Sequence, residues 1–214
     1  MTFQNTKKDV EVLMICVIDY DAGNLESVCK ALKYIGQDVL VTRDENEIMR
    51  AQRLILPGVG AFGDAMGNLS SLGLDRTIRE YVGTGRPFLG ICLGLQLLFD
   101  SSEESPGVEG LGLLRGCVKR FPNDMGLKIP HIGWNSLEIA PSSRLFKGID
   151  DGSYFYFVHS YYLQAEDEAD VAGVTEYGIR FHAAAEHGNI FATQFHPEKS
   201  GEIGLAVLEN FAKL

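Results

Sequence analysis

The stretch Arg86-Pro-Phe-Leu-Gly-Ile-Cys-Leu-Gly-Leu-Gln-Leu-Leu-Phe99 decides the fold of this chain. Residues 87–91 form an apolar run long enough for a buried strand, and residues 93–99 continue it without a turn signal, so Cys92 lies where a strand passes into a helix. Gly90 and Gly94 flank Cys92, and Gly-x-Cys-x-Gly is the thiol form of the nucleophile elbow, in which glycines permit a sharp turn that exposes one side chain. Unpaired N–H groups at the start of a helix favour the thiolate. The stretch therefore predicts a nucleophilic cysteine.

The composition is that of a globular domain. The chain has 214 residues, enough to bury a full core, and its hydrophobic content is 45%. The formal net charge of −10 argues against a nucleic-acid partner, because few cations are available to neutralise phosphates. The four cysteines form no CxxC pair and no zinc-type spacing with histidine, which predicts neither disulfides nor a metal site. Because no run reaches the roughly 20 apolar residues of a membrane span, we expect a soluble, cytoplasmic protein without membrane contact.

The first half of the chain alternates between strand and helix patterns. A strand covered on both faces is predicted at residues 12–18 and further strands at 38–42 and 53–56, with helices at 25–35, 45–51, 64–69 and 74–82. This alternation indicates βαβ units and a parallel sheet. After residue 111 the helices stop, and six short strand-like runs follow at residues 111–121, 129–139, 154–158, 171–176, 181–186 and 189–195.

These patterns predict an α/β fold with a mixed, mainly parallel central sheet flanked by helices and with added antiparallel strands in the C-terminal half. A helix at residues 202–213 closes the chain. Residues 1–11 are polar and are interpreted as an N-terminal extension, and residues 12–214 as one domain.

A glycine-rich segment, Pro57-Gly-Val-Gly-Ala-Phe-Gly63, follows the third predicted strand. Parallel strands place the loops at their carboxyl ends along one edge of the sheet, so this segment and Cys92 are expected to lie close together. Backbone N–H groups of Gly58, Val59 and Leu93 would then form an oxyanion hole. A dinucleotide site is the competing interpretation, but the segment follows the third strand and no acidic residue ends the next one.

The sequence also offers a base for the thiol. The apolar run 189–195 leads into His196-Pro-Glu198, and Pro197 biases His196 towards an extended backbone at the end of a strand. Glu198 is two residues further on, so in an extended chain its side chain points the same way and reaches the imidazole. Cys92, His196 and Glu198 thus fit the roles of nucleophile, base and orienting carboxylate.

These motifs resemble those of the class I, triad-type glutamine amidotransferases. Within that class the chain is most similar to the glutaminase subunits of imidazole glycerol phosphate synthases, on the basis of four further motifs: Pro57-Gly-Val-Gly-Ala-Phe-Gly63, Pro130-His-Ile-Gly-Trp-Asn135, Phe157-Val-His-Ser-Tyr161 and Gln194-Phe-His-Pro-Glu-Lys-Ser200. The resemblance extends from residue 12 to the C-terminus and implies a flavodoxin-like core.

The resemblance also implies a function. Cys92 would attack the side-chain amide of L-glutamine, His196 would protonate the departing ammonia, and Glu198 would orient His196. Gln96, Ser160 and Tyr161 would hold the glutamine. The oxyanion strand would need a backbone flip, triggered from a partner. That partner would be a separate (β/α)8-barrel cyclase subunit, which uses the ammonia to make imidazole glycerol phosphate and AICAR in histidine biosynthesis. Neither a cofactor nor a metal is implied.

The partner interface and the exact family stay open at this point. Candidates for the interface with the cyclase are Asn24, Trp134, Asn135 and Lys199. Two other glutaminase families share the elbow and the triad, namely the subunits of anthranilate and aminodeoxychorismate synthases, although the Gly-Trp-Asn segment and Lys199 favour the first assignment. A stand-alone cysteine hydrolase and a scaffold with a structural cysteine are further alternatives.

Overall fold

The computed structural model describes residues 14–21 and 24–214. The predicted N-terminal extension, residues 1–11, and the first two residues of the strand predicted at 12–18 lie outside these ranges. Within the described part, the first strand is β1 (Met14–Ile18).

Five parallel strands form the centre of the molecule. Their order is β2-β1-β3-β4-β13, with bounds Asp38–Thr42 for β2, Arg53–Leu56 for β3, Phe88–Ile91 for β4 and Ile190–Thr193 for β13. The inner strands β1, β3 and β4 are apolar except for Arg53 at the start of β3, because helices cover both faces of the sheet. The predicted mainly parallel sheet is therefore confirmed.

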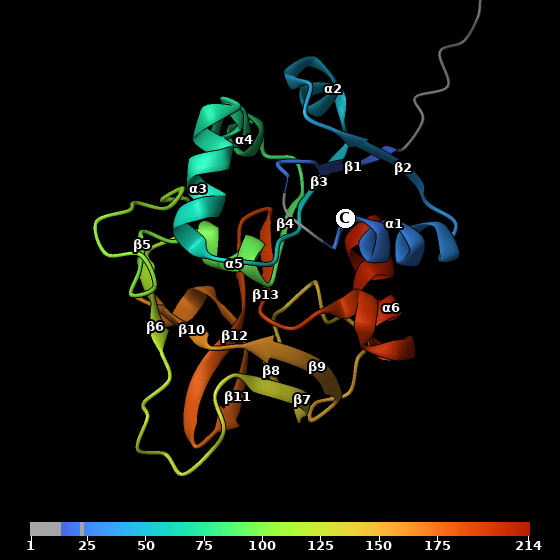
Figure 1. Cartoon of the computed structure of the whole chain (residues 1–214). Coiled ribbons are helices and arrows are strands. Elements are labelled where there is room, and N and C mark those ends of the chain that lie inside the picture. The colour runs from blue at the N-terminus through green and yellow to red at the C-terminus, as the bar shows by residue number, and fades with distance from the viewer. Residues whose placement is uncertain (1–13, 22–23) are drawn as a thin grey trace, which may run out of the picture.

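The helices divide between the two faces of this sheet (Figure 1). α1 (Leu25–Tyr34) and α6 (Gly201–Ala212) pack on one face, where Ile15 and Val17 of β1 join their apolar side chains. α2 (Glu45–Arg50), α3 (Phe62–Ser71) and α4 (Leu74–Gly83) lie over the other face, together with Cys16 and Ile18. Successive residues of β1 thus serve opposite cores, as the two-residue period of a strand requires.

The C-terminal half extends this sheet with antiparallel strands. β12 (Ile179–His187) pairs with β13, β10 (Tyr161–Ala165) with β12, and β6 (Gly116–Arg120) with β10, while β11 (Val171–Tyr177) pairs with β12 and β8 (Glu138–Ile139) with β11. The short strand β5 (Ser101–Ser102) pairs parallel with β6. A separate two-stranded sheet consists of β7 (His131–Ser136) and β9 (Tyr154–His159). The predicted strand at 129–139 was wrong in extent, because it is two strands in two different sheets, and β10 was not predicted.

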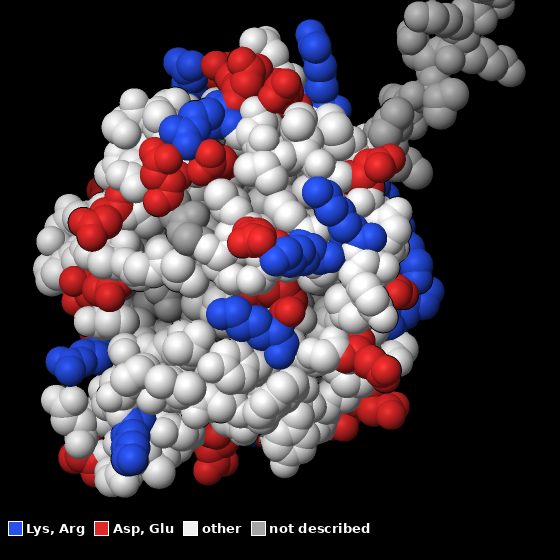
Figure 2. Space-filling model, turned by 45° about the vertical axis from the view of Figure 1, so that its right-hand side comes forward, with Lys and Arg blue, Asp and Glu red and all other residues white. Residues whose placement is uncertain are grey.

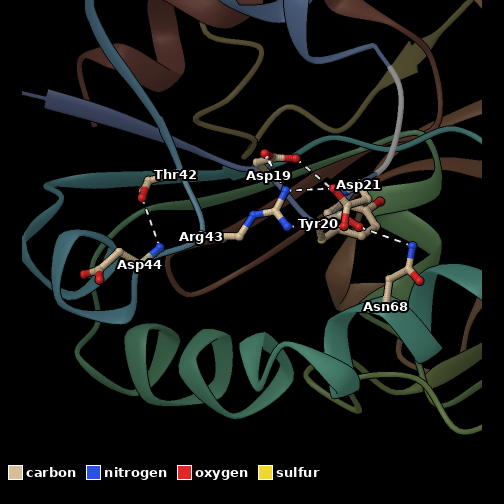
Figure 3. Close-up of polar contacts among 7 residues, drawn as sticks. All are labelled: Asp19, Tyr20, Asp21, Thr42, Arg43, Asp44 and Asn68. Atoms are coloured by element: carbon tan, nitrogen blue, oxygen red, sulfur yellow. Dashed lines mark hydrogen bonds and ion pairs between the residues drawn. The ribbon is translucent and has the colours of Figure 1, made fainter.

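The loop after β1 is tied down at the carboxyl edge of the sheet (Figure 3). Nη2 of Arg43 lies 2.7 Å from Oδ2 of Asp19 and 2.7 Å from Oδ1 of Asp21. The backbone carbonyl of Tyr20 accepts a hydrogen bond of 3.3 Å from Nδ2 of Asn68 in α3. Partly exposed ion pairs contribute little to the free energy of unfolding, so the main effect of this cluster is to fix the position of the loop beside the glycine-rich segment.

The surface carries charges of both signs. Figure 2 shows Lys and Arg interspersed with Asp and Glu on the visible face, without a continuous basic stripe among the described residues. No helix in the described ranges is long and apolar enough to cross a membrane.

Candidate active site

Cys92 occupies a strained turn between β4 and α5 (Leu93–Leu97). Its backbone has φ 55° and ψ −107°, a combination that side-chain-bearing residues rarely adopt and that costs of order 1–3 kcal/mol. The flanking glycines allow the turn to pack closely, because a Cβ atom on Gly94 would lie 1.8 Å from the carbonyl oxygen of Leu56, and one on Gly90 would lie 2.7 Å from the carbonyl oxygen of Gly94. The sharp turn predicted from the Gly-x-Cys-x-Gly spacing is therefore present.

His196 and Glu198 follow the adjacent strand, β13, and both side chains are 0% exposed. Nδ1 of His196 lies 2.8 Å from Oε1 of Glu198. The two residues meet by a different route from the predicted one: His196 is extended, but Glu198 lies in a 3-10 turn, Pro197–Lys199. The turn, started by Pro197, folds the carboxylate back onto the ring. Asn24 also donates from Nδ2 to Oε1 of Glu198, at 2.5 Å.

The electrostatics of this group favour a protonated His196. Burial lowers the pKa of His196, but the neighbouring sulfur of Cys92 and the carboxylate of Glu198 outweigh it, and together they raise this pKa to about 9. At neutral pH His196 is therefore an imidazolium beside the sulfur. Nε2 of His196 has no hydrogen-bond partner in bonding geometry among the described residues, so this N–H is free to act on a substrate.

A cavity of about 320 Å³ opens beside the sulfur. Most of the residues predicted to act on glutamine line it, and they come from four separate parts of the chain: Val59 from the glycine-rich segment, Cys92, Leu93 and Gln96 from the elbow, Ser160 and Tyr161 from the junction of β9 and β10, and His196 after β13. The structure therefore brings together residues that lie more than 100 positions apart in the sequence. Gly58 lies behind this lining, packed against Tyr20 and Leu93.

The N–H of Leu93, one of the predicted oxyanion donors, is engaged within the chain. It donates to the carbonyl oxygen of Gly58 across a long distance of 3.4 Å. The glycine-rich segment thus presents a carbonyl, not an N–H group, to the elbow. The hydroxyl of Tyr20 donates to the preceding carbonyl, that of Pro57, at 2.9 Å, so the start of the segment is anchored to the loop after β1.

Two polar residues near the sulfur were missed by the sequence reasoning. Glu104 is, among the described residues that line the cavity, the one that brings a carboxylate, and its Oε2 accepts a hydrogen bond of 2.8 Å from the N–H of Phe62. Nε2 of Gln194 lies 3.7 Å from the sulfur of Cys92. Glu104 lies in a polar, turn-rich stretch without a motif. Gln194 precedes His196 by only two residues, which indicates that it lies near the site but does not indicate what it does there.

The four interface candidates divide into two kinds. Trp134 and Lys199 are exposed, and Trp134 packs edge-on against Tyr156 of β9. Asn24 and Asn135 turn their side chains inward instead, Asn24 to Glu198 and Asn135 to the carbonyl oxygen of Glu176 at 2.8 Å. Within residues 14–21 and 24–214, no group of three or more His, Cys, Asp or Glu side chains is arranged to hold a metal ion.

Comparison with known proteins assigns the class. The family model for class I glutamine amidotransferases matches residues 16–214. A crystal structure of a glutamine amidotransferase superposes with a TM-score of 0.72 at 22% identity, and the match covers 93% of this chain and 99% of that one, which shows the shared fold. A cysteine elbow, a buried His–Glu pair and a cavity beside them fit this class, and the chain belongs to the class I glutamine amidotransferases.

More similar relatives narrow the family. The chain is 54% identical over 200 residues to the imidazole glycerol phosphate synthase subunit HisH of Moorella thermoacetica, covering 94% of each chain. It is 53% identical to the HisH subunit of Methanothermobacter thermautotrophicus, covering 94% of this chain and 98% of the relative. The chain is therefore a member of the HisH family, which the motifs had favoured over the anthranilate and aminodeoxychorismate synthase subunits.

Proposed function

We propose that this chain is the glutaminase subunit of an imidazole glycerol phosphate synthase and that Cys92, His196 and Glu198 are its catalytic triad. The observation that carries the proposal is the buried Nδ1–Oε1 contact of 2.8 Å behind an imidazole that lines the cavity beside the elbow cysteine and whose other nitrogen has no hydrogen-bond partner among the described residues. An orienting carboxylate, a ring and a nucleophile in this order are the requirements of acyl transfer through a thioester.

The proposed reaction has two stages. The thiolate of Cys92 attacks the side-chain amide carbon of glutamine, and the imidazolium of His196 gives its proton to the departing nitrogen, which leaves as ammonia. The neutral imidazole then takes a proton from water, the hydroxide attacks the glutamyl thioester, and glutamate leaves as the thiolate and the imidazolium re-form. The raised pKa of His196, about 9, suits its starting role as an acid at neutral pH.

Substrate recognition is proposed for the polar residues of the cavity. Gln96, Ser160 and Tyr161 hold the glutamine, as the family resemblance implies. We add Glu104, because a free amino acid carries an α-ammonium group and Glu104 supplies a carboxylate to the cavity wall.

The oxyanion hole is proposed to form by rotation of the peptide between Gly58 and Val59. In the present arrangement the Gly58 carbonyl accepts from the N–H of Leu93, so this donor is occupied. Rotation would remove the carbonyl and bring the N–H of Val59 beside that of Leu93, giving two donors for the tetrahedral intermediate. Gly58 has no Cβ to oppose the rotation, and Gly60 already has φ 110°, a region open to glycine.

The ammonia is proposed to pass to a (β/α)8-barrel cyclase subunit, because ammonia released into neutral water is protonated and is no longer a nucleophile. Trp134 and Lys199 are exposed and supply side chains for that interface, while Asn24 and Asn135 lie beneath it. Docking of the partner against this face would place it within reach of both the triad carboxylate and the cavity rim.

The division of labour is tested with Cys92→Ala in the complex with a cognate cyclase. Glutamine-dependent synthesis of imidazole glycerol phosphate is expected to fall to the background rate, because no thioester can form, while synthesis from added ammonium salts is retained. Cys117→Ala, which alters a half-buried cysteine on β6, is the matched control. Loss of ammonia-dependent synthesis in Cys92→Ala, with the complex intact, would contradict the proposal.

A further inference from the structure

A row of buried polar side chains lies beside the triad without belonging to it. Gln194 is 0% exposed, Gln96 5%, His159 6% and His131 3%. Two amides and two imidazoles in an interior position are costly unless each donor and acceptor is satisfied. In this chain these side chains are hydrogen-bonded to one another or to backbone carbonyls, and Gln194, the last of them, contacts the sulfur of Cys92.

A backbone carbonyl fixes the direction of the two amides. The carbonyl oxygen of Tyr161 can only accept, so Gln96 must turn its NH₂ group to it, at 3.3 Å. The same Nε2 of Gln96 donates to Gln194 at 3.1 Å, so the atom of Gln194 on that side must be the acceptor, Oε1. The NH₂ group of Gln194 therefore faces the other way, towards Sγ of Cys92 at 3.7 Å. The hydrogen bonds to Gln96 and the Tyr161 carbonyl therefore require that the NH₂ group of Gln194, and not its oxygen, face the sulfur.

The two imidazoles anchor the same carbonyl from its other side. Nδ1 of His159 lies 2.7 Å from the Tyr161 oxygen and must carry a proton, and Nε2 of His159 then accepts from Nδ1 of His131 at 3.0 Å. Burial lowers the pKa of His159 to about 3 and that of His131 to about 4, so both rings stay neutral and keep these tautomers across the physiological range. The Tyr161 carbonyl is thus held by a ring as well as by Gln96.

We propose that Gln194 is a positioning residue for the nucleophile: its side-chain amide, oriented through Gln96 by the Tyr161 carbonyl, donates an N–H to the sulfur of Cys92 and stabilises the thiolate. The inference rests on the proposed function only in so far as that sulfur is the nucleophile. It adds to the triad a second, uncharged donor for the sulfur. Hydrogen bonds to a charged group are stronger than those to a neutral one, so the donor favours the thiolate over the thiol.

The test measures the thiolate directly. The full-length chain is alkylated with iodoacetamide across a range of pH, and modification of the peptide that contains Cys92 is followed by mass spectrometry. In Gln194→Met, which keeps the length and apolar volume of the side chain but has no N–H, the acid limb of the alkylation profile is expected to move up by about one pH unit, since a hydrogen bond to a charged group changes an equilibrium by roughly tenfold.

Two further variants make the result decisive. Thr193→Val removes a buried hydroxyl from the same strand, one that bonds the carbonyl of Phe195 at 3.2 Å, and its profile is expected to match that of the unmodified sequence. Gln96→Met leaves Gln194 in place but removes the group that orients it, so a smaller shift in the same direction is expected; this variant carries the test if Gln194→Met does not fold.

A profile of folded Gln194→Met that superimposes on that of Thr193→Val would overturn the proposal. Alkylation needs neither glutamine nor a cyclase, so this experiment can contradict the role of Gln194 without contradicting the proposed glutaminase function, and the reverse. A chain that shows the shift in alkylation but hydrolyses no glutamine with its cyclase would refute the proposed function and leave the role of Gln194 standing.

Discussion

Glu198 lies against His196 without exposure to solvent, and its charge affects the pH range over which the imidazole stays protonated. The pKa of His196 is raised to about 9, against burial, by Cys92 and by this carboxylate. Glutamine hydrolysis by the complex is therefore expected to decline as the pH rises through about 9, because the acid that protonates ammonia is lost. Glu198→Gln removes the negative charge, so the basic limb of the kcat/KM profile should move to lower pH.

A carboxylate four residues further on provides the control for this change. Glu202 is exposed in the first turn of α6, and Glu202→Gln is expected to leave the basic limb unchanged. A basic limb that stays in place in Glu198→Gln, while Glu202→Gln behaves as the unmodified chain does, would show that Glu198 does not set the protonation of His196.

The residues of the proposed triad could be singled out from the sequence because each lies in a short motif with a physical meaning. The glycines on either side of Cys92 indicate a sharp turn, and Pro197 after His196 indicates that a strand ends there. Gln194 and Glu104 carry no such local mark, because their contacts arise only in the folded chain: Gln194 follows β13 and accepts from Gln96 of α5, and Glu104 follows β5 and lines the cavity. The direction of the Gln194 amide depends on a backbone carbonyl 33 positions away, at Tyr161, which no local pattern records.

The contact of helix α5 with strand β3 determines the position of the elbow. Gly94→Ala would place a Cβ atom 1.8 Å from the Leu56 carbonyl, so the helix and the strand must separate. The free energy of unfolding is expected to fall by at least about 2 kcal/mol, measured by urea denaturation. Gly67→Ala in α3 is the control: a Cβ there meets nothing within 4 Å, and alanine is expected to raise the free energy of unfolding by about 0.5–1 kcal/mol. Equal effects of the two substitutions would contradict this packing argument.

The helices and parallel strands could be predicted closely, and the antiparallel strands less well. Strands β2 and β3 have the predicted bounds, because each is a short, largely apolar run between clear turn signals. Strand β10, Tyr161–Ala165, is less apolar, and only Leu163 and Ala165 are buried, so its pattern does not differ from that of a loop. The division of residues 129–139 between two sheets depends on pairing with β9 and β11, which are distant in sequence.

The molecule as a whole presents one apolar sheet face beside its cavity. In the β7–β9 sheet, Trp134 is 55% exposed and Ile132 and Tyr154 are each 59% exposed, while Val158 of the same sheet lines the cavity. Contiguous exposed apolar side chains mark surfaces that bind partners, and aromatic residues dominate the affinity of such surfaces. This face is the one on which we place the cyclase.

Trp134→Ala is accordingly expected to weaken binding of the cyclase by at least about tenfold, measured by titration calorimetry, with a change in the free energy of unfolding below about 0.5 kcal/mol. Leu72→Ala, at the turn between α3 and α4, removes another partly exposed apolar side chain and should leave the affinity unchanged. Equal affinities of the Trp134 and Leu72 variants would place the partner elsewhere.

The hydrogen bond between the N–H of Leu93 and the carbonyl of Gly58 has a consequence for the consumption of glutamine in the cell. If the proposed oxyanion hole is correct, this carbonyl occupies an N–H donor that the tetrahedral intermediate needs, and it is tethered to the site at a fixed, high local concentration. Raising the glutamine concentration would not relieve this block, because the carbonyl opposes formation of the intermediate and not binding of the substrate. Glutamine hydrolysis without a partner would then be limited by how often the peptide between Gly58 and Val59 rotates spontaneously, and glutamine would be spared until a partner can use the nitrogen.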